Sequence, residues 1–506
     1  MRLRSNILVN YAGQAYITLI GLVVVPVYVA GLGEEAYGLI GFFAMLQAWF
    51  MLLDLGMTAT LTREAARASG GATHPRIYRR LYDLLSSVSA GIALVAAGAI
   101  WLSSDAIARR WLGEHTLEPG DVEFAVQVMA VAIGCRWLAG LYRGVLVGAE
   151  RLALLNVLNA AFATLRFLAV IVTMEIAGYS VRVFFAHQLA VALLEALWLR
   201  AVATRMVSAL PAGHGEEPVS VSQLRSHFAF ALSVTFTSSV WVVVTQSDKL
   251  ILSRLLSLSD YGLFSMATLL AGGVVMVAVP ITGALLPRLA AMEAEGRSVE
   301  LVDLYRKSTR LVSVVAGAAM LTLVFFAELV IHAWTGRTSD TRELYMTVTL
   351  YAFGNGCLNF SSLVYCIQYA RGRVRMHVIG NALLLACLLP LVFWLVPRWG
   401  LVGAGVAWAT VHLAYLLFWV TYTHAHLVRG LAMRWLLFDV LVVLAPGLLG
   451  GWLLSAFGTF DGSRAAMIVH VLLAGGAMVL LCYCGQLVSR RLEARVFGES
   501  KAWVAG

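Results

Sequence analysis

The chain has 506 residues, of which 60% are hydrophobic and only 13% are charged. Soluble domains carry about 25% charged residues, and a core at this length cannot hide so much apolar surface, so a soluble globular protein is excluded. The net charge of +9 does not indicate nucleic-acid binding, because the basic residues are dispersed through short loops between apolar runs. Such a distribution is typical of a polytopic membrane protein.

Apolar runs of about 20 residues follow one another along the chain, and as a helix each would cross roughly 30 Å of hydrocarbon. The first run is too long for the hydrophobic region of a cleavable signal peptide, so we expect it to remain as a span. We predict an all-α, polytopic membrane protein with fourteen spans, at residues 7–30, 38–61, 82–102, 122–147, 153–175, 179–199, 227–252, 261–287, 310–333, 344–369, 376–396, 402–422, 435–457 and 465–488.

The basic residues of the loops support this map. If the chain begins in the cytoplasm, the segments on that side hold 25 Lys and Arg residues and the outer loops hold 8. Positive charge collects on the cytoplasmic side, and one missed span would reverse the bias of everything downstream. We therefore expect a multi-pass protein of the bacterial inner membrane with both termini in the cytoplasm.

The longest polar stretch separates the sixth and seventh spans and contains Pro211 and Pro218, so it is predicted to be a linker. With this linker between two bundles, we expect the chain to have five parts. These are an N-terminal six-helix bundle at 1–203, a cytoplasmic linker at 204–226, a C-terminal six-helix bundle at 227–424, an appended helix pair at 425–488 and a cytoplasmic tail at 489–506.

A faint internal repeat agrees with two bundles. The segment from Leu32 to Leu39 follows the first span, and the segment from Leu256 to Leu263 follows the seventh, at a constant offset of 224 residues and with Tyr-Gly-Leu in the same place. Six intervening helices preserve the direction of crossing. The halves are therefore expected to be related by a pseudo-two-fold axis along the membrane normal, as in several transporter folds.

Charges inside the apolar runs are the candidate functional groups, since a mid-membrane charge costs roughly 2.5–3.5 kcal/mol and usually faces a partner or a wet cavity. Arg136 and Arg143 lie two turns apart on one face of the fourth span, and Arg166 lies in the middle of the fifth. Guanidinium groups bind phosphates with paired hydrogen bonds, so these three residues could hold a diphosphate. In the alternative, Arg143 extends to the cytoplasmic surface, and Arg136 or Arg166 neutralises a buried carboxylate.

The seventh span carries two adjacent charges, Asp248 and Lys249, near its predicted outer end. Neighbouring positions on a helix point about 100° apart, so these two side chains cannot pair well with each other. Lys249 is a further candidate for the substrate cavity. In the alternative, Lys249 extends to the membrane interface and Asp248 caps the helix or pairs with Arg254.

Membrane carboxylates can take up a proton or a sodium ion and so couple transport to a gradient. Asp54 and Glu195, in the cytoplasmic halves of their spans, and Asp248 are therefore candidates for ion coupling, with pairing to an arginine as the alternative. We interpret His187, His332 and His412 as hydrogen-bonded packing residues. The six cysteines lack zinc-ligand spacing, so we predict no metal site and no cofactor.

Several motifs lie in roughly the first 65 residues and in residues 240–290. They are Asn6 to Tyr11, Pro26 with Gly31-Leu32-Gly33 and Tyr37-Gly38, Leu53-Asp54-Leu55-Gly56 with Arg63-Glu64, and Ser247-Asp248-Lys249-Leu250-Ile251-Leu252 through Tyr261-Gly262. As a set, these motifs resemble those of the bacterial lipid-linked oligosaccharide flippases for O-antigen and exopolysaccharide, within the multidrug/oligosaccharidyl-lipid/polysaccharide exporter superfamily.

This resemblance implies a central cavity that opens alternately to either face and an undecaprenyl-diphosphate-linked oligosaccharide as the cargo. It also implies coupling to a proton or sodium gradient and no catalytic residues. Membrane lipids, a polysaccharide polymerase and chain-length machinery are the implied partners. Fourteen spans are more similar to the lipid II flippase branch, where the extra helix pair borders a groove for the lipid tail.

Two alternatives remain at this point. A drug or cation antiporter of the same superfamily should have an acidic cavity, whereas the mid-span charges of the fourth and fifth spans are all arginine. A membrane polysaccharide polymerase or ligase should have a sizeable outer loop. The longest outer loop, residues 103–121, carries four acids but no convincing acid–base arrangement.

Overall fold

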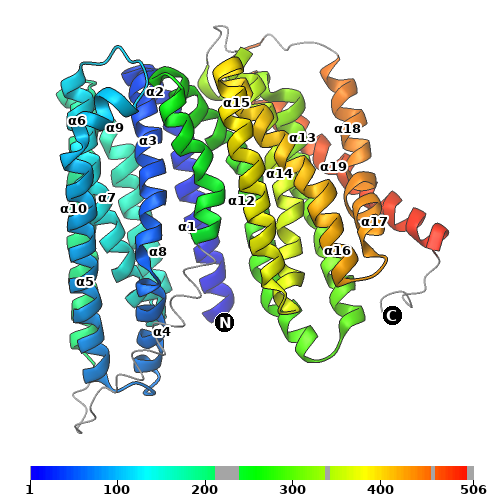
Figure 1. Cartoon of the computed structure of the whole chain (residues 1–506), viewed down its shortest axis with the longest axis horizontal. Coiled ribbons are helices and arrows are strands. Elements are labelled where there is room, and N and C mark those ends of the chain that lie inside the picture. The colour runs from blue at the N-terminus through cyan, green and yellow to red at the C-terminus, as the bar shows by residue number, and fades with distance from the viewer. Residues whose placement is uncertain (1, 211–238, 337–341, 457–461, 498–506) are drawn as a thin grey trace. The chain divides into compact units, whose positions relative to one another are not determined.

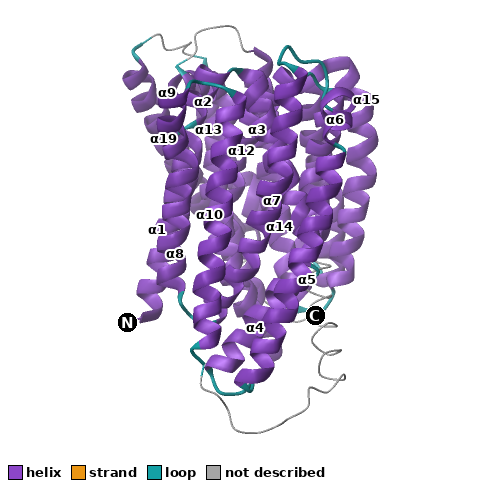
Figure 2. Ribbon diagram, turned by 90° about the vertical axis from the view of Figure 1, so that its left-hand side faces the viewer, coloured by secondary structure: helices purple, strands orange, loops and turns teal. Residues whose placement is uncertain are grey.

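The computed structural model describes residues 2–210, 239–336, 342–456 and 462–497, and within these ranges the secondary structure is helical without a strand (Figure 2). The chain divides into two compact units, Met1–Gly262 and Leu263–Gly506. The described helices of the first unit are α1 (Arg2–Val23), α2 (Val25–Leu32), α3 (Glu34–Phe50), α4 (Met57–Ser69), α5 (Pro75–Leu102), α6 (Ser104–Ala106), α7 (Pro119–Gly148), α8 (Leu152–Thr164), α9 (Val170–Ala177), α10 (Val181–Ser208) and a helix over residues 239–255.

The second unit contains most of α12 (Leu258–Ala294), which begins in the first unit. The helices that follow are α13 (Ser298–Thr335), α14 (Arg342–Ala370), α15 (Val374–Ala414), α16 (Thr421–Leu427), α17 (Leu431–Arg434), α18 (Val442–Ser455) and α19 (Arg464–Phe497) (Figure 1). Most faces of α7 are buried in the first unit, and α13 is similarly enclosed in the second.

The predicted spans correspond to helices of the described chain, which confirms the all-α membrane fold. Eleven helices are long and apolar enough to cross a membrane, and one of these segments, Val374–Leu427, holds two predicted spans. That segment bends at Gly400, where φ is 51°. The predicted seventh span is helical over residues 239–255, and α14 occupies the tenth. Residues 227–238 of the predicted seventh span lie outside the described residues.

The second predicted span, 38–61, is shorter in the structure because it ends at Asp54. Leu55 and Gly56 adopt left-handed backbone angles, with φ of 44° and 77°, and a new helix, α4, starts at Met57. Gly56 takes such an angle without strain, so it favours a break of the helix at this point, whereas the angle at Leu55 is uncommon for a residue with a side chain. The apolar run therefore contains a turn that hydropathy alone does not reveal.

The two units divide after Gly262, so the helix over 239–255 groups with the first unit and not with the second bundle as predicted. Contacts with the loop between α6 and α7 explain this grouping. Leu258 N donates to Glu114 O at 3.1 Å, and Trp111 Nε1 donates to Ser253 Oγ at 3.0 Å. Residues 489–497, which belong to the predicted tail, continue α19.

The two copies of the internal repeat meet in a reciprocal contact. Gly38 packs against the backbone of Leu258, and Gly262 packs against the backbone of Glu34. Both pairs are related by the 224-residue offset of the repeat, so the contact has the self-complementary form of a two-fold interface. Ser259 Oγ adds a hydrogen bond to Glu34 Oε2 at 2.9 Å. A Cβ at either glycine would collide with the opposing main chain.

We expect Gly38→Ala and Gly262→Ala to lower the free energy of unfolding by similar amounts, about 1–3 kcal/mol each, because the opposing backbone cannot move aside as a side chain can. Thermal unfolding in detergent would measure this. Gly272→Ala on α12 is the control, since a Cβ there meets open space. Equal tolerance of all three substitutions would contradict the reciprocal contact.

Candidate functional site

A buried charge cluster in the first unit joins two of the predicted arginines to the predicted carboxylate Glu195. Glu195 on α10 is fully buried, and its Oε1 accepts hydrogen bonds from Arg143 Nη2 on α7 and from Arg166 Nη2, the latter at 3.3 Å. Arg166 lies in η3 (Leu165–Ala169), a π-helical turn between α8 and α9. A single carboxylate oxygen is thus shared by two guanidinium groups. The other oxygen, Oε2, has no hydrogen-bond partner among the described residues.

Arg136 completes the cluster but has a different environment. Its side chain donates to two neutral amides, from Nη1 to Gln47 Oε1 at 3.0 Å and from Nη2 to Gln188 Oε1 at 2.5 Å. Its guanidinium lies 4.7 Å from the centre of the Phe43 ring. Within the described part of the chain, no carboxylate forms an ion pair with Arg136.

The charges of this cluster do not balance. Three guanidinium groups face one carboxylate, which leaves an excess of two positive charges among Arg136, Arg143, Arg166 and Glu195. The Nε–H of each arginine is also buried and lacks a partner among the described residues. Guanidinium donors of this kind bind carboxylates and phosphates. The arrangement is suited to receiving an anion.

Both sequence interpretations of these residues are represented in the structure. Arg166 neutralises a buried carboxylate, as the alternative interpretation expected, whereas Arg136 has no such partner. Arg143 pairs with the same carboxylate, which neither interpretation expected. Arg143 turns toward Glu195, although 28% of its side chain stays exposed. Sequence reasoning missed Gln47 and Gln188. A glutamine in the middle of an apolar span was the signal that could have identified them.

The other candidates occupy different places. Asp54 lies at the end of the second span, directly before the turn into α4. Its Oδ1 accepts hydrogen bonds from Thr58 N at 3.2 Å and from Thr58 Oγ1 at 2.5 Å. It therefore satisfies donors in the first turn of α4, as a capping residue does. Asp248 is buried and Lys249 is half-buried on the helix over 239–255. Their roles stay predictions. Among the described residues, no group of three or more His, Cys, Asp or Glu side chains is placed to hold a metal ion.

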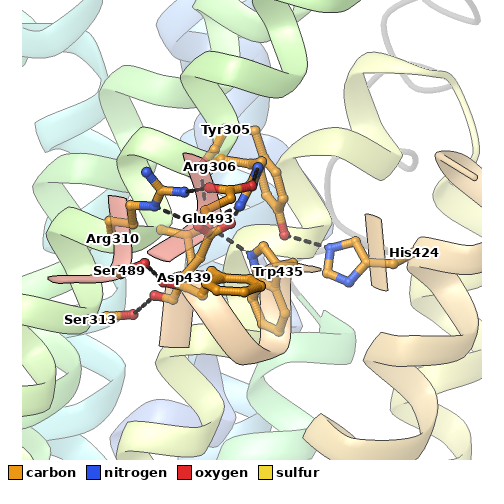
Figure 3. Close-up of polar contacts among 11 residues, drawn as sticks. Tyr305, Arg306, Arg310, Ser313, His424, Trp435, Asp439, Ser489 and Glu493 are labelled. Carbon is orange, nitrogen blue, oxygen red and sulfur yellow. Dashed lines mark hydrogen bonds and ion pairs between the residues drawn. The ribbon is translucent and has the colours of Figure 1, made fainter. Parts of the chain in front are cut away.

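A second buried ion cluster lies in the second unit, and the sequence did not predict it (Figure 3). Asp439, in the π-helical turn η5 (Trp435–Leu441), accepts from Arg306 Nε and Nη2 at 2.6 and 2.9 Å and from Arg310 Nε at 2.6 Å. Glu493 on α19 accepts from both arginines as well. Two positive charges meet two negative charges here, so this cluster is electrically balanced.

Further hydrogen bonds bind this balanced cluster into the unit. Ser313 Oγ donates to Asp439 O at 2.8 Å, and Ser489 Oγ donates to Phe438 O. Trp435 Nε1 donates to Thr309 Oγ1 at 3.0 Å (Figure 3). These contacts tie η5 and α19 to α13. The balanced cluster therefore anchors the appended helix pair, and it offers no charge excess for a ligand.

Comparisons with known proteins agree with a membrane transporter. A family model described as "Polysaccharide biosynthesis protein" matches residues 3–293, more than half of the chain. A "Putative O-antigen transporter" of Shigella flexneri is 21% identical over 421 residues, which cover 81% of this chain and 94% of that relative.

Two solved structures share the fold at low sequence identity. The lipid II flippase MurJ in an inward closed conformation matches with a TM-score of 0.69 at 12% identity, over 96% of this chain and 99% of MurJ. An inward-facing multidrug resistance transporter of the MATE family, within the MOP superfamily, matches with a TM-score of 0.65 at 14% identity, over 81% and 94% of the two chains. Likeness at this identity establishes the fold alone.

We expect Asp439→Asn to lower the free energy of unfolding by about 3–5 kcal/mol, because it leaves two buried arginines without their shared carboxylate. Asp303→Asn on the same helix as the arginines is the matched control. It removes a partly exposed i, i+4 ion pair with Lys307, and ion pairs near the surface contribute about 1 kcal/mol or less. Equal stability of the two variants in thermal unfolding would contradict an anchoring role for the balanced cluster.

Proposed function

The chain belongs to the polysaccharide biosynthesis protein family, and we propose that it is a flippase for an undecaprenyl-diphosphate-linked oligosaccharide. It would carry this cargo from the cytoplasmic to the periplasmic face of the inner membrane by alternating access, without covalent chemistry. The name of the Shigella flexneri relative and the fold shared with MurJ support a saccharide-bearing lipid as the cargo.

The observation that carries this proposal is the charge excess of the first cluster. Buried charges are costly unless they are matched, yet Arg136 has only neutral amides and an aromatic ring as described partners. A diphosphate brings at least two negative charges and several acceptor oxygens. It would match the two excess charges and the three buried Nε–H groups of the arginines.

The proposed mechanism depends on competition for two guanidinium groups. Glu195 occupies Arg143 and Arg166 in the described conformation, and the diphosphate would displace it while the polyprenyl tail stays in the lipid. Cargo can drive alternation only by binding the inward- and outward-open states with different affinity. Protonation of Glu195 would free both arginines, which makes Glu195 our first candidate for coupling to a proton or sodium gradient, ahead of Asp54 and Asp248.

The excess of positive charge in alternate loops supports cytoplasmic termini and an inner-membrane location. We propose the lipid-linked oligosaccharide and membrane lipids as binding partners, and a polysaccharide polymerase with its chain-length machinery as protein partners. The likeness to a multidrug transporter favours a drug or cation antiporter as the second candidate. A cationic substrate would meet unfavourable charge at Arg136, which makes this candidate the weaker one.

Cells without the protein are expected to accumulate undecaprenyl-linked oligosaccharide on the cytoplasmic face. Expression of the wild-type protein in these cells should remove the accumulated lipid, and expression of Arg136→Ala should not. We expect a loss of translocation of about tenfold or more, because hydrogen bonds to a charged group contribute about 1.5–3 kcal/mol. Arg182→Ala is the matched control, since Arg182 pairs with Asp121 at an exposed site. Unchanged lipid intermediates together with altered drug resistance would favour the antiporter.

Glu195→Gln should lower the unfolding temperature, because it removes the carboxylate shared by two arginines. Undecaprenyl diphosphate should then restore more stability to Glu195→Gln than it adds to the wild type, since the lipid no longer competes with the carboxylate. Thermal unfolding with and without the lipid measures both effects. If the lipid stabilised the wild type more strongly than the variant, competition at this site would be refuted.

A further inference from the structure

The π-helical turn that carries Arg166 interrupts an otherwise regular span. η3 covers Leu165–Ala169, directly between α8 and α9. A π turn holds more residues than an α turn, is rare, and occurs frequently at functional sites. The extra residue rotates the helix on one side of the turn relative to the other. The direction in which Arg166 points therefore depends on where the turn is placed.

Three side chains from neighbouring helices bind consecutive carbonyl groups of this turn. His187 Nε2 bonds to Leu165 O at 2.9 Å, and Gln188 Nε2 donates to Arg166 O at 2.9 Å, both from α10. Tyr28 Oη, from α2, donates to Phe167 O at 2.6 Å. Because a carbonyl oxygen only accepts, Nε2 of the imidazole must carry hydrogen.

These donors supply hydrogen bonds that the backbone carbonyl groups of a membrane helix need. A carbonyl that is displaced from the regular hydrogen-bond ladder has no water to bond, and leaving it unsatisfied is unfavourable. The second nitrogen of His187, Nδ1, lies 2.9 Å from Thr173 Oγ1, which itself donates to Ala169 O at 3.0 Å. Side chains thus bind four of the five carbonyl groups of the turn, those of Leu165, Arg166, Phe167 and Ala169.

Gln188 connects the turn to the other arginines. Its amide nitrogen donates to Arg166 O, while its amide oxygen accepts from Arg136 Nη2 at 2.5 Å. The buried amide of Gln188 therefore acts as a donor to the backbone of Arg166 and as an acceptor from the guanidinium of Arg136. Arg166 Nη2 in turn reaches Glu195 at 3.3 Å.

We propose that Tyr28, His187 and Gln188 are positioning residues that hold η3 in its π-helical register and thereby direct Arg166 toward Glu195, beside Arg136. Their importance for diphosphate binding rests on the proposed function, whereas the positioning itself does not. Without its donors the extra residue can shift along the helix. A shift of one residue turns a side chain by about 100°, which would remove Arg166 from Glu195.

A test that needs no cargo measures the coupling between Arg166 and Glu195. A double-mutant cycle of Arg166→Met and Glu195→Gln, followed by thermal unfolding in detergent, gives this coupling. In a Tyr28→Phe background, which removes only one hydroxyl group, we expect the coupling to fall to half of its wild-type value or less. The matched control is Tyr16→Phe, because Tyr16 Oη contacts Thr164 Oγ1, one residue before η3, at 2.7 Å and touches no carbonyl of the turn. Unchanged coupling in Tyr28→Phe would overturn the proposal.

A second pair of variants keeps the test decisive if Tyr28→Phe does not fold. His187→Ala should reduce the same coupling, and His187→Gln should restore it, because a glutamine amide nitrogen can donate to Leu165 O in place of Nε2. A residue with only a packing role would not show this rescue. Equal coupling in His187→Ala and in the wild type would refute the proposal.

Binding of undecaprenyl diphosphate in lipid nanodiscs separates this inference from the proposed function. Tyr28→Phe should weaken binding by about fivefold, the effect of one typical hydrogen bond, and Tyr16→Phe should leave it unchanged. Reduced coupling together with weaker binding would support both ideas. If the coupling falls in the Tyr28→Phe background but the wild-type protein does not bind this lipid, the positioning role is supported and the proposed function is refuted.

Discussion

A guanidinium group buried in a membrane protein needs partners for its charge and its donors, and this constraint organises both units. Each unit has an enclosed helix, α7 or α13, that carries two arginines. In the second unit Asp439 and Glu493 balance both charges. Among the described residues of the first unit, Glu195 is the carboxylate that pairs with arginines of the cluster. This difference separates an anchoring cluster from one that can accept an anionic ligand.

Both clusters depend on the same departure from regular helix. Arg166 lies in the π-helical turn η3 and Asp439 lies in the π-helical turn η5. In each turn, consecutive carbonyl groups accept side-chain donors from neighbouring helices, at Leu165 to Phe167 in the first case and at Phe438 and Asp439 in the second. Helix irregularities in membranes persist where neighbours satisfy the freed backbone groups. In this protein the two π-helical turns also set the direction of the Arg166 and Asp439 side chains.

Sequence repetition and structure agree where the two copies of the repeat meet. Gly38 and Gly262 occupy equivalent positions in the two copies. Gly38 packs on the backbone of Leu258, and Gly262 packs on the backbone of Glu34, the residue equivalent to Leu258. Close backbone contact of this kind needs glycine on both sides. The glycine of the Tyr-Gly-Leu match is thus explained by a steric requirement that applies to both copies of the repeat.

The sequence by itself determined the helical membrane class, the spans, the repeat and the three arginines of the first cluster, because apolar length, loop charge and glycine spacing are local properties. Only the tertiary structure decided that Glu195 is the shared partner, that the chain divides after Gly262 and that Arg306, Arg310 and Glu493 surround Asp439. Hydropathy ends a span where charges begin, so the first turns of α13 and the last turns of α19 were assigned to a loop and to the tail. The π turns were also hidden, since a change of hydrogen-bond register depends on donors from other helices, and residues far apart in the chain supply them.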